Sequence, residues 1–251
     1  MLKRLGFICI CSLLFISCKT GSYKVERLSV QLIALDTDVA SKEADSMRQL
    51  ILPYKNEMDT QLNKKIGFLP ERMTANPPES LLSNFCADAL LNYVRSTEKI
   101  QADIAILNFG GLRKPLETGD LTIRDMFELM PFENKVVVIE LSGKELHQLF
   151  DAFARKGGEV LSGAKMGIAD GKAVDILINN IPLDDAKYYK AVTSDYLSEG
   201  NDGMLPLKNF RSSTPLNKKM RDVFTEYILQ QTAKGKQIQS ALDKRVYVLQ
   251  K

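Results

Sequence analysis

The sequence predicts an α+β domain built on a mixed β-sheet, preceded by an export segment and a helical arm. Three observations favour this class. Predicted helices and strands interleave irregularly, whereas a doubly wound parallel sheet requires regular alternation. No repeat of fixed period and no low-complexity tract occurs in the 251 residues. The chain left after the export segment is long enough to bury one substantial hydrophobic core.

The N-terminus has the pattern of a bacterial export signal. Residues 1–4 include the basic Lys3 and Arg4, and residues 5–16 form an almost unbroken apolar run that is too short to span a bilayer as a permanent helix. Residues 15–18, Phe-Ile-Ser-Cys, resemble a lipobox, so Cys18 is the expected lipidated first residue. A cleaved secretory signal in which Cys18 has no role is the alternative. We expect a signal peptide over residues 1–17 and a protein that is exported and lipid-anchored to a bacterial cell membrane, in the periplasm or at the cell surface.

Residues 18–63 are expected to form a lipid tether, one strand and a helical arm. Alternating apolar side chains predict the strand over residues 28–35. Apolar residues at helical spacing predict a helix over residues 41–62, with a kink at Pro53. We expect this arm to pack on the main domain, which covers residues 64–251.

Local patterns predict the elements of the main domain. The apolar stripe over residues 81–94 is wide, which indicates a central helix. Ser142 and Glu145 form a capping box that starts a second helix. The other predicted elements are helices over residues 143–155 and 217–231 and strands over residues 102–108, 135–141, 173–178, 188–193 and 245–249.

The residue types present exclude several kinds of catalysis. Hydrolysis by two metal ions needs several imidazoles and carboxylates, and His147 is the one histidine of the chain. No Gly-x-Ser-x-Gly turn presents a nucleophile, and no phosphate-binding P-loop occurs. Cys86 lies in the apolar stripe of the central helix, where a thiol is protonated and inert. The sequence therefore predicts no catalytic residue and no metal ligand in this chain.

Charge and cysteine content bear on possible ligands and on how the fold is stabilised. The net charge is +3, and basic and acidic residues are mixed along the chain, so the sequence gives no indication of nucleic-acid binding. Of the four cysteines, Cys86 alone lies beyond the export signal and its edge. The folded part is therefore expected to be stabilised by its core rather than by disulfides.

Three loops carry residue types that core packing does not require. In residues 108–113, Asn-Phe-Gly-Gly-Leu-Arg, the glycines let the backbone approach a ligand and the arginine can pair with an anionic oxygen. Residues 131–134, Pro-Phe-Glu-Asn, place an aromatic ring and an amide before a strand. Residues 195–203 place Tyr196 before Asp202 in a loop flanked by glycines.

In this order and spacing, the loops resemble the C-terminal domain of the 5'-nucleotidase family. The resemblance covers about residues 64–211, with departures at Phe109 and Asn201, where the family has glycines. Four segments carry it: residues 79–88 (Glu-Ser-Leu-Leu-Ser-Asn-Phe-Cys-Ala-Asp), 108–113, 131–134 with Leu-Ser-Gly at 141–143, and 194–203 (Ser-Asp-Tyr-Leu before Gly-Asn-Asp-Gly).

The resemblance implies a pocket for a nucleotide or nucleoside ligand. Phe132 and Tyr196 would hold the base between two aromatic faces, and Asn134 would read a base edge. Asp202 would accept hydrogen bonds from ribose hydroxyls, and Arg113 would meet the phosphate or ribose side. The implied substrate-binding residues are Asn108, Gly111, Arg113, Phe132, Asn134, Tyr196 and Asp202. The residues alone leave other roles open: Phe132 could belong to the core, and Arg113 and Asp202 could stabilise their loops.

Three functions follow from this resemblance. In the family, a separate N-terminal metallophosphatase domain holds two metal ions, and none of its histidine-rich motifs is present here. The leading hypothesis is the nucleotide-binding half of a split 5'-nucleotidase, which acts in the hydrolysis of nucleoside 5'-phosphates together with a separate metallophosphatase protein. Divalent metals are then expected on that partner and no cofactor in this chain, so whether the chain counts as an enzyme stays open. The alternatives are a non-catalytic nucleotide- or nucleoside-binding lipoprotein and a scaffold with a vestigial pocket.

Overall fold

The structure, a computed structural model, describes residues 27–30 and 45–249 of the chain. The chain divides into two units, Met1–Leu52 and Pro53–Lys251. The predicted signal peptide, Cys18 and most of the predicted strand over residues 28–35 lie outside the described residues. Residues 28–30, the described part of that strand, have no regular secondary structure. Within the described ranges, no helix is both long enough and apolar enough to cross a membrane.

The predicted helical arm forms as a helix. None of the residues of α3 (Asp45–Leu62), all of which the structure describes, is buried. Tyr54 and Met58, in its second half, are 67% and 59% exposed. Arg124 forms an ion pair with Asp59 and donates from Nε to Asn63 at 3.1 Å. No residue of α3 belongs to either described core of the main domain, and packing of the whole arm on that domain stays a prediction.

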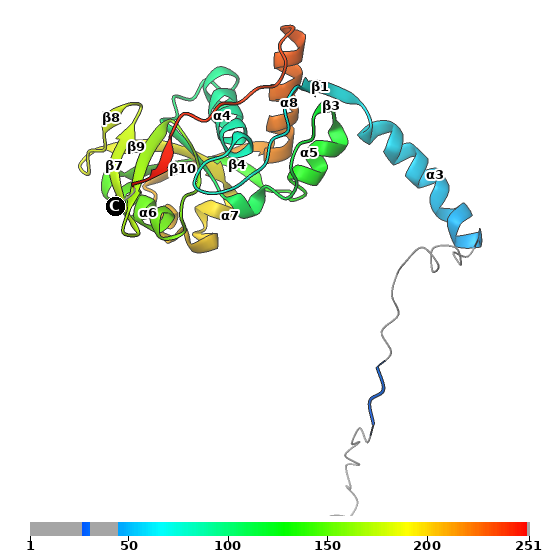
Figure 1. Cartoon of the computed structure of the whole chain (residues 1–251), viewed down its shortest axis with the longest axis horizontal. Coiled ribbons are helices and arrows are strands. Elements are labelled where there is room, and N and C mark those ends of the chain that lie inside the picture. Colours follow the sequence, from blue (N-terminus) through cyan, green and yellow to red (C-terminus); the bar gives the residue numbers. More distant parts are fainter. Residues whose placement is uncertain (1–26, 31–44, 250–251) are drawn as a thin grey trace, which may run out of the picture. The chain divides into compact units, whose positions relative to one another are not determined.

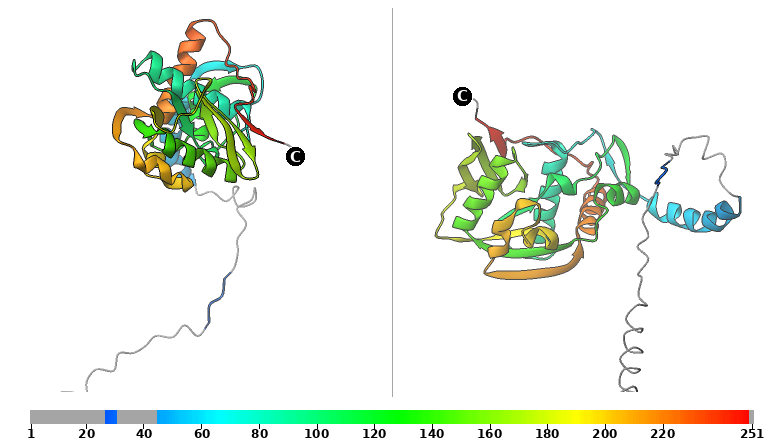
Figure 2. Two further views of the ribbon diagram at one scale, coloured as in Figure 1. Left: turned by 90° about the vertical axis from the view of Figure 1, so that its left-hand side faces the viewer. Right: turned by 90° about the horizontal axis from the view of Figure 1, so that it is seen from below.

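The described residues after α3 form a mixed α+β domain, as the sequence predicts (Figures 1 and 2). The largest sheet has five strands in the order β10-β4-β9-β2-β5. β9 pairs antiparallel with β4 and parallel with β2, so the sheet is mixed. Its strands are β2 (Ile104–Leu107), β4 (Lys135–Ser142), β5 (Val160–Ser162), β9 (Tyr188–Ser194) and β10 (Ser212–Lys219).

Two smaller sheets complete the described strands. A four-stranded sheet has the order β11-β6-β7-β8, with β11 parallel to β6, and β1 pairs antiparallel with β3. Their bounds are β1 (Lys65–Leu69), β3 (Gly119–Thr122), β6 (Ala164–Ala169), β7 (Lys172–Ile178), β8 (Ile181–Pro182) and β11 (Val246–Val248). The helices of the domain are α4 (Leu81–Ser96), α5 (Ile123–Leu129), α6 (Gly143–Arg155), α7 (Asp195–Ser198) and α8 (Met220–Ala233). Short 3-10 turns are η1 (Phe109–Gly111), η2 (Asn201–Gly203) and η3 (Leu205–Asn209).

The five-stranded sheet is buried on both faces, because its strands alternate apolar side chains between two cores. Val136 and Val138 of β4 join the core that includes α4 and α8. Val137 and Ile139 of the same strand join the core that includes α6. Capping boxes start both α4 and α6, and the one on α6 is the box predicted from the sequence. Local side-chain pattern and capping thus account for the central elements.

The prediction is wrong at the start of α8. The predicted helix over residues 217–231 begins instead at Met220, because residues 217–219 belong to β10. β10 is an edge strand that pairs antiparallel with β4. Its side chains are mostly exposed, so no alternation of apolar residues marks it in the sequence. Backbone pairing with a distant strand, rather than local preference, makes this segment extended.

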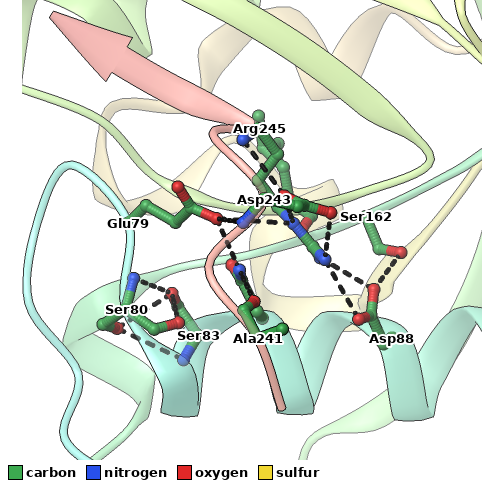
Figure 3. Close-up of polar contacts among 10 residues, drawn as sticks. Glu79, Ser80, Ser83, Asp88, Ser162, Ala241, Asp243 and Arg245 are labelled. Carbon is green, nitrogen blue, oxygen red and sulfur yellow. Dashed lines mark hydrogen bonds and ion pairs between the residues drawn. The ribbon is translucent and has the colours of Figure 1, made fainter.

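A buried arginine ties the C-terminal segment to α4 (Figure 3). The side chain of Arg245 is 9% exposed and donates to both carboxylate oxygens of Asp88, at 2.7 and 3.1 Å. It also donates to both oxygens of Asp243, at 2.9 and 3.0 Å. Glu79 accepts from the side chain of Asn84 at 2.6 Å and from the backbone N–H of Asp243 at 2.9 Å. The polar residues of segment 79–88 therefore hold the returning end of the chain.

We predict that Arg245→Met lowers the free energy of unfolding by about 1.5–3 kcal/mol, because it removes the charge-assisted hydrogen bonds to Asp88 and Asp243, whose side chains are 38% and 47% exposed. Arg72→Met is the matched control: Arg72 pairs with Glu117, and their side chains are 55% and 60% exposed. An exposed pair of this kind contributes less than about 1 kcal/mol. Urea unfolding followed by circular dichroism measures both changes, and equal losses in the two variants would contradict the prediction.

Candidate functional site

Three loops meet at one edge of the five-stranded sheet. β2 and β9 run parallel, so their carboxyl ends lie at the same edge. β4 runs antiparallel to β9, so its amino end lies there as well. Residues 108–113 follow β2, residues 131–134 precede β4, and residues 195–203 follow β9. The topology therefore brings together the three loops that the sequence singles out.

The loops enclose a pocket with a volume of about 380 Å³. All seven residues that were expected from the sequence to bind substrate line it. The lining also includes Gly110, which was not among them. The complete lining is Asn108, Gly110, Gly111, Arg113, Phe132, Asn134, Tyr196 and Asp202.

Two aromatic rings line the pocket without being part of the core. Phe132 is 42% exposed and Tyr196 is 41% exposed, which excludes the alternative that Phe132 is a core residue. The guanidinium of Arg113 lies 5.9 Å from the centre of the Phe132 ring. It also donates to the carbonyl oxygen of Gly110 at 3.1 Å. The pocket thus combines flat apolar faces with one cationic group.

Asp202 is the centre of the polar contacts in the pocket. Its carboxylate accepts from the hydroxyl of Tyr196 at 3.0 Å and from the side-chain amide of Asn108. The hydrogen bond to this carboxylate raises the pKa of Tyr196. Asp202 is exposed, so these protein donors can exchange with hydroxyl donors of a ligand. The carboxylate therefore both stabilises its loop and remains open to the pocket.

Gly111 is required by the position of the Asn108 side chain. A Cβ atom on Gly111 would lie 2.7 Å from Oδ1 of Asn108, closer than such contacts allow. The glycine lets the side chain of Asn108 fold over its own loop and reach Asp202. The second glycine of the pair seen in the sequence thus shapes the pocket by leaving space for the Asn108 side chain.

Lys156 and Glu159 lie behind the pocket and were not predicted from the sequence. Glu159 is 5% exposed, and its carboxylate accepts from the Phe109 N–H at 3.1 Å and from Lys156 Nζ at 3.0 Å. Burial raises the pKa of Glu159, and the contacts with Lys156 and Phe109 oppose that rise. The segment Lys-Gly-Gly-Glu has the pattern of a solvated turn, so no local feature marks Glu159 as buried.

The histidine and the buried cysteine of the described residues lie outside the pocket. Within residues 27–30 and 45–249, no group of three or more His, Cys, Asp or Glu side chains could hold a metal ion. His147 lies on α6 with its Nδ1 3.3 Å from Asp185, and its side chain is about half exposed. Cys86 is fully buried, and burial raises its pKa, so the prediction of an inert core thiol is confirmed.

The fold and the pocket define a class of protein: an α+β domain with a pocket between loops at one edge of a mixed sheet. Comparison with protein families gives the particular family. The model of the family described as "5'-nucleotidase, C-terminal domain" matches residues 61–209. The chain belongs to this family.

Individual relatives agree with this assignment. Protein UshA of Escherichia coli (strain K12) is 29% identical over 174 residues, which cover 66% of this chain and 31% of UshA. The trifunctional nucleotide phosphoesterase protein YfkN of Bacillus subtilis (strain 168) is 24% identical over 218 residues, 78% of this chain and 15% of YfkN. The crystal structure of a 5'-nucleotidase precursor from Thermus thermophilus has the same fold, with a TM-score of 0.69 at 22% identity, covering 81% of this chain and 43% of that one. This chain therefore spans less than half of each of these proteins.

Proposed function

We propose that this chain binds a nucleotide, through its nucleoside part, in the pocket between the three loops. One observation carries the proposal: a single pocket is lined by two exposed aromatic rings, a carboxylate and a guanidinium. Stacking a base on an aromatic side chain contributes about 1–3 kcal/mol and tolerates different bases. Phe132 and Tyr196 supply the rings, and Asn134 supplies an amide for a base edge. Such a pocket accepts nucleosides with little discrimination between bases.

The charged residues of the pocket serve the sugar and the phosphate. Asp202 accepts from ribose hydroxyls, which replace the donors from Tyr196 and Asn108. Arg113 pairs with a phosphate or ribose oxygen. Among the described residues that line the pocket, Arg113 is the one cation and Asp202 the one anion. This balance favours a nucleoside monophosphate over a polyphosphate.

We further infer that hydrolysis takes place together with a second polypeptide, a metallophosphatase that carries the divalent metal ions. A two-metal phosphatase site needs several imidazoles and carboxylates, and this chain has one histidine. This chain covers 31% of UshA, so the rest of UshA is long enough to contain such a site. The products would be a nucleoside and phosphate, which places the pair in nucleotide catabolism. A non-catalytic nucleotide-binding lipoprotein is the alternative.

We also propose that the chain is exported and anchored to a bacterial membrane through a lipid on Cys18. The support is the charged start of the chain, the apolar run over residues 5–16 and the lipobox-like segment that ends at Cys18. A lipid anchor would hold the nucleotide-binding domain where nucleotides outside the cytoplasm are captured.

Binding is tested by calorimetric titration with AMP and adenosine in metal-free buffer. We predict saturable binding that Phe132→Ala weakens roughly 5- to 150-fold, the equivalent of one stacked base. Phe68→Ala is the matched control, because Phe68 is 39% exposed on β1 and does not line the pocket. The control should keep the wild-type affinity. Absence of binding to the wild-type chain, or an equal loss in both variants, would contradict the proposed pocket.

The same titration separates the candidate functions. Full affinity in the isolated chain favours the non-catalytic binding lipoprotein. Weak affinity that increases when the metallophosphatase is added favours the split enzyme. If Phe132→Ala changes neither ligand affinity nor the activity of the partner, the pocket is vestigial.

Partner and anchor are tested by cross-linking in native cell envelopes, followed by affinity purification through a C-terminal tag. We predict that a metallophosphatase is recovered, and that Cys18→Ala moves the chain from the membrane to the soluble fraction. Cys86→Ala, which removes the buried thiol, is the control and should stay in the membrane fraction. Repeated purification without a metallophosphatase overturns the split enzyme. Membrane retention of the Cys18 variant overturns the lipid anchor.

A further inference from the structure

A lysine outside the pocket holds the turn that carries Asp202. Asp202 and Gly203 both have left-handed backbone conformations, with φ of 53° and 74°. Aspartate tolerates this conformation less well than glycine, so the turn depends on its surroundings. Lys156 Nζ donates to the main-chain oxygen of Asp202 at 2.6 Å. Lys156 therefore fixes the piece of backbone from which the Asp202 carboxylate reaches the pocket.

Lys156 is in turn held by a buried carboxylate. The side chain of Glu159 is 6% exposed and that of Lys156 is 39% exposed, and the two form an ion pair at 3.0 Å. The other oxygen of Glu159 accepts the backbone N–H of Phe109 at 3.1 Å. A buried carboxylate is tolerated when a counterion and hydrogen-bond donors compensate it. Lys156 supplies the counterion, and Phe109, near the start of residues 108–113 (the glycine loop), supplies a backbone donor.

These contacts close a ring around two of the three pocket loops. The ring runs from the Phe109 N–H to Glu159, from Glu159 to Lys156, and from Lys156 to the carbonyl of Asp202. The side-chain amide of Asn108, the neighbour of Phe109, closes it at the Asp202 carboxylate. Each residue of the ring is thus joined to the next by a hydrogen bond, except Asn108 and Phe109, which are joined by their peptide bond.

We propose that Lys156 and Glu159 are positioning residues that set the placement of the glycine loop relative to the Asp202 turn, and through it the affinity of the pocket for a nucleoside. Neither residue is among the described residues that line the pocket, so both act through Asp202 and the glycine loop. This proposal rests on the proposed function, since it concerns the affinity of that same pocket.

A double-mutant cycle tests the proposal, with adenosine as the ligand. Lys156→Met keeps the aliphatic stem of the side chain and should weaken binding roughly fivefold or more. Lys156→Arg should restore most of the affinity. In an Asp202→Gly background, which removes the carboxylate and suits the left-handed turn, Lys156→Met should weaken binding less than about twofold. Equal losses in the two backgrounds would overturn the proposal, because a general loss of stability does not depend on Asp202.

Lys218→Met is the matched control for the charge change. Lys218 is 29% exposed and ion-paired with Glu226, away from the described lining of the pocket. Its replacement should leave adenosine affinity unchanged. A loss equal to that of Lys156→Met would show that removing any paired lysine has the same effect, and would contradict a specific role.

Amide hydrogen exchange without ligand separates this proposal from the proposed function. Lys156→Met should speed exchange of the Phe109 amide at least roughly tenfold while the amides of α4 keep their protection. Glu159→Gln, which keeps the shape of the side chain but removes the charge that holds Lys156, should act in the same direction and serves if Lys156→Met does not fold. Unchanged exchange at Phe109 in both variants overturns the proposal. Faster exchange without any adenosine binding supports the positioning ring and contradicts the nucleotide pocket.

Discussion

The pocket depends on the pairing of β9 with two strands of opposite direction. Its parallel pairing with β2 and antiparallel pairing with β4 bring three loops, distant in the sequence, to one sheet edge. The register is fixed because adjacent residues of β9, Ala191 and Val192, belong to the two different cores. A slip of one residue would exchange the two faces of the strand. Burial of apolar side chains thus sets the distances between polar groups in the pocket.

The segments that resemble the 5'-nucleotidase family divide into two structural roles. Segments 108–113, 131–134 and 194–203 supply the pocket. Segment 79–88 instead belongs to the scaffold: its Glu79 and Asp88 hold the chain end that contains Arg245. One group of polar residues therefore closes the domain and another faces the ligand. A change in the first group is expected to act on stability, and a change in the second on binding.

The sequence predicted what local pattern or family resemblance determines. Periodicity and a capping box predicted α6 over its observed residues, and resemblance predicted every lining residue of the pocket except Gly110. Contacts between distant segments were not predictable in the same way. β10 is a strand because β4 pairs with it, although the side chains of β10 are mostly exposed. Arg245 and Lys156 were missed since their partners come from segments that meet only in the folded chain.

A base held between Phe132 and Tyr196 is the feature on which the proposed function depends. Its most direct test is an NMR measurement of intermolecular nuclear Overhauser effects between adenosine and protein whose phenylalanine and tyrosine rings are isotopically labelled. We predict contacts from the adenine protons to both rings, and contacts from the ribose protons to the Asp202 turn. The proposed function would be contradicted if adenine made contacts with neither ring. The ligand would then lie at another surface, such as the polar pocket lined by Asp88 and Lys165.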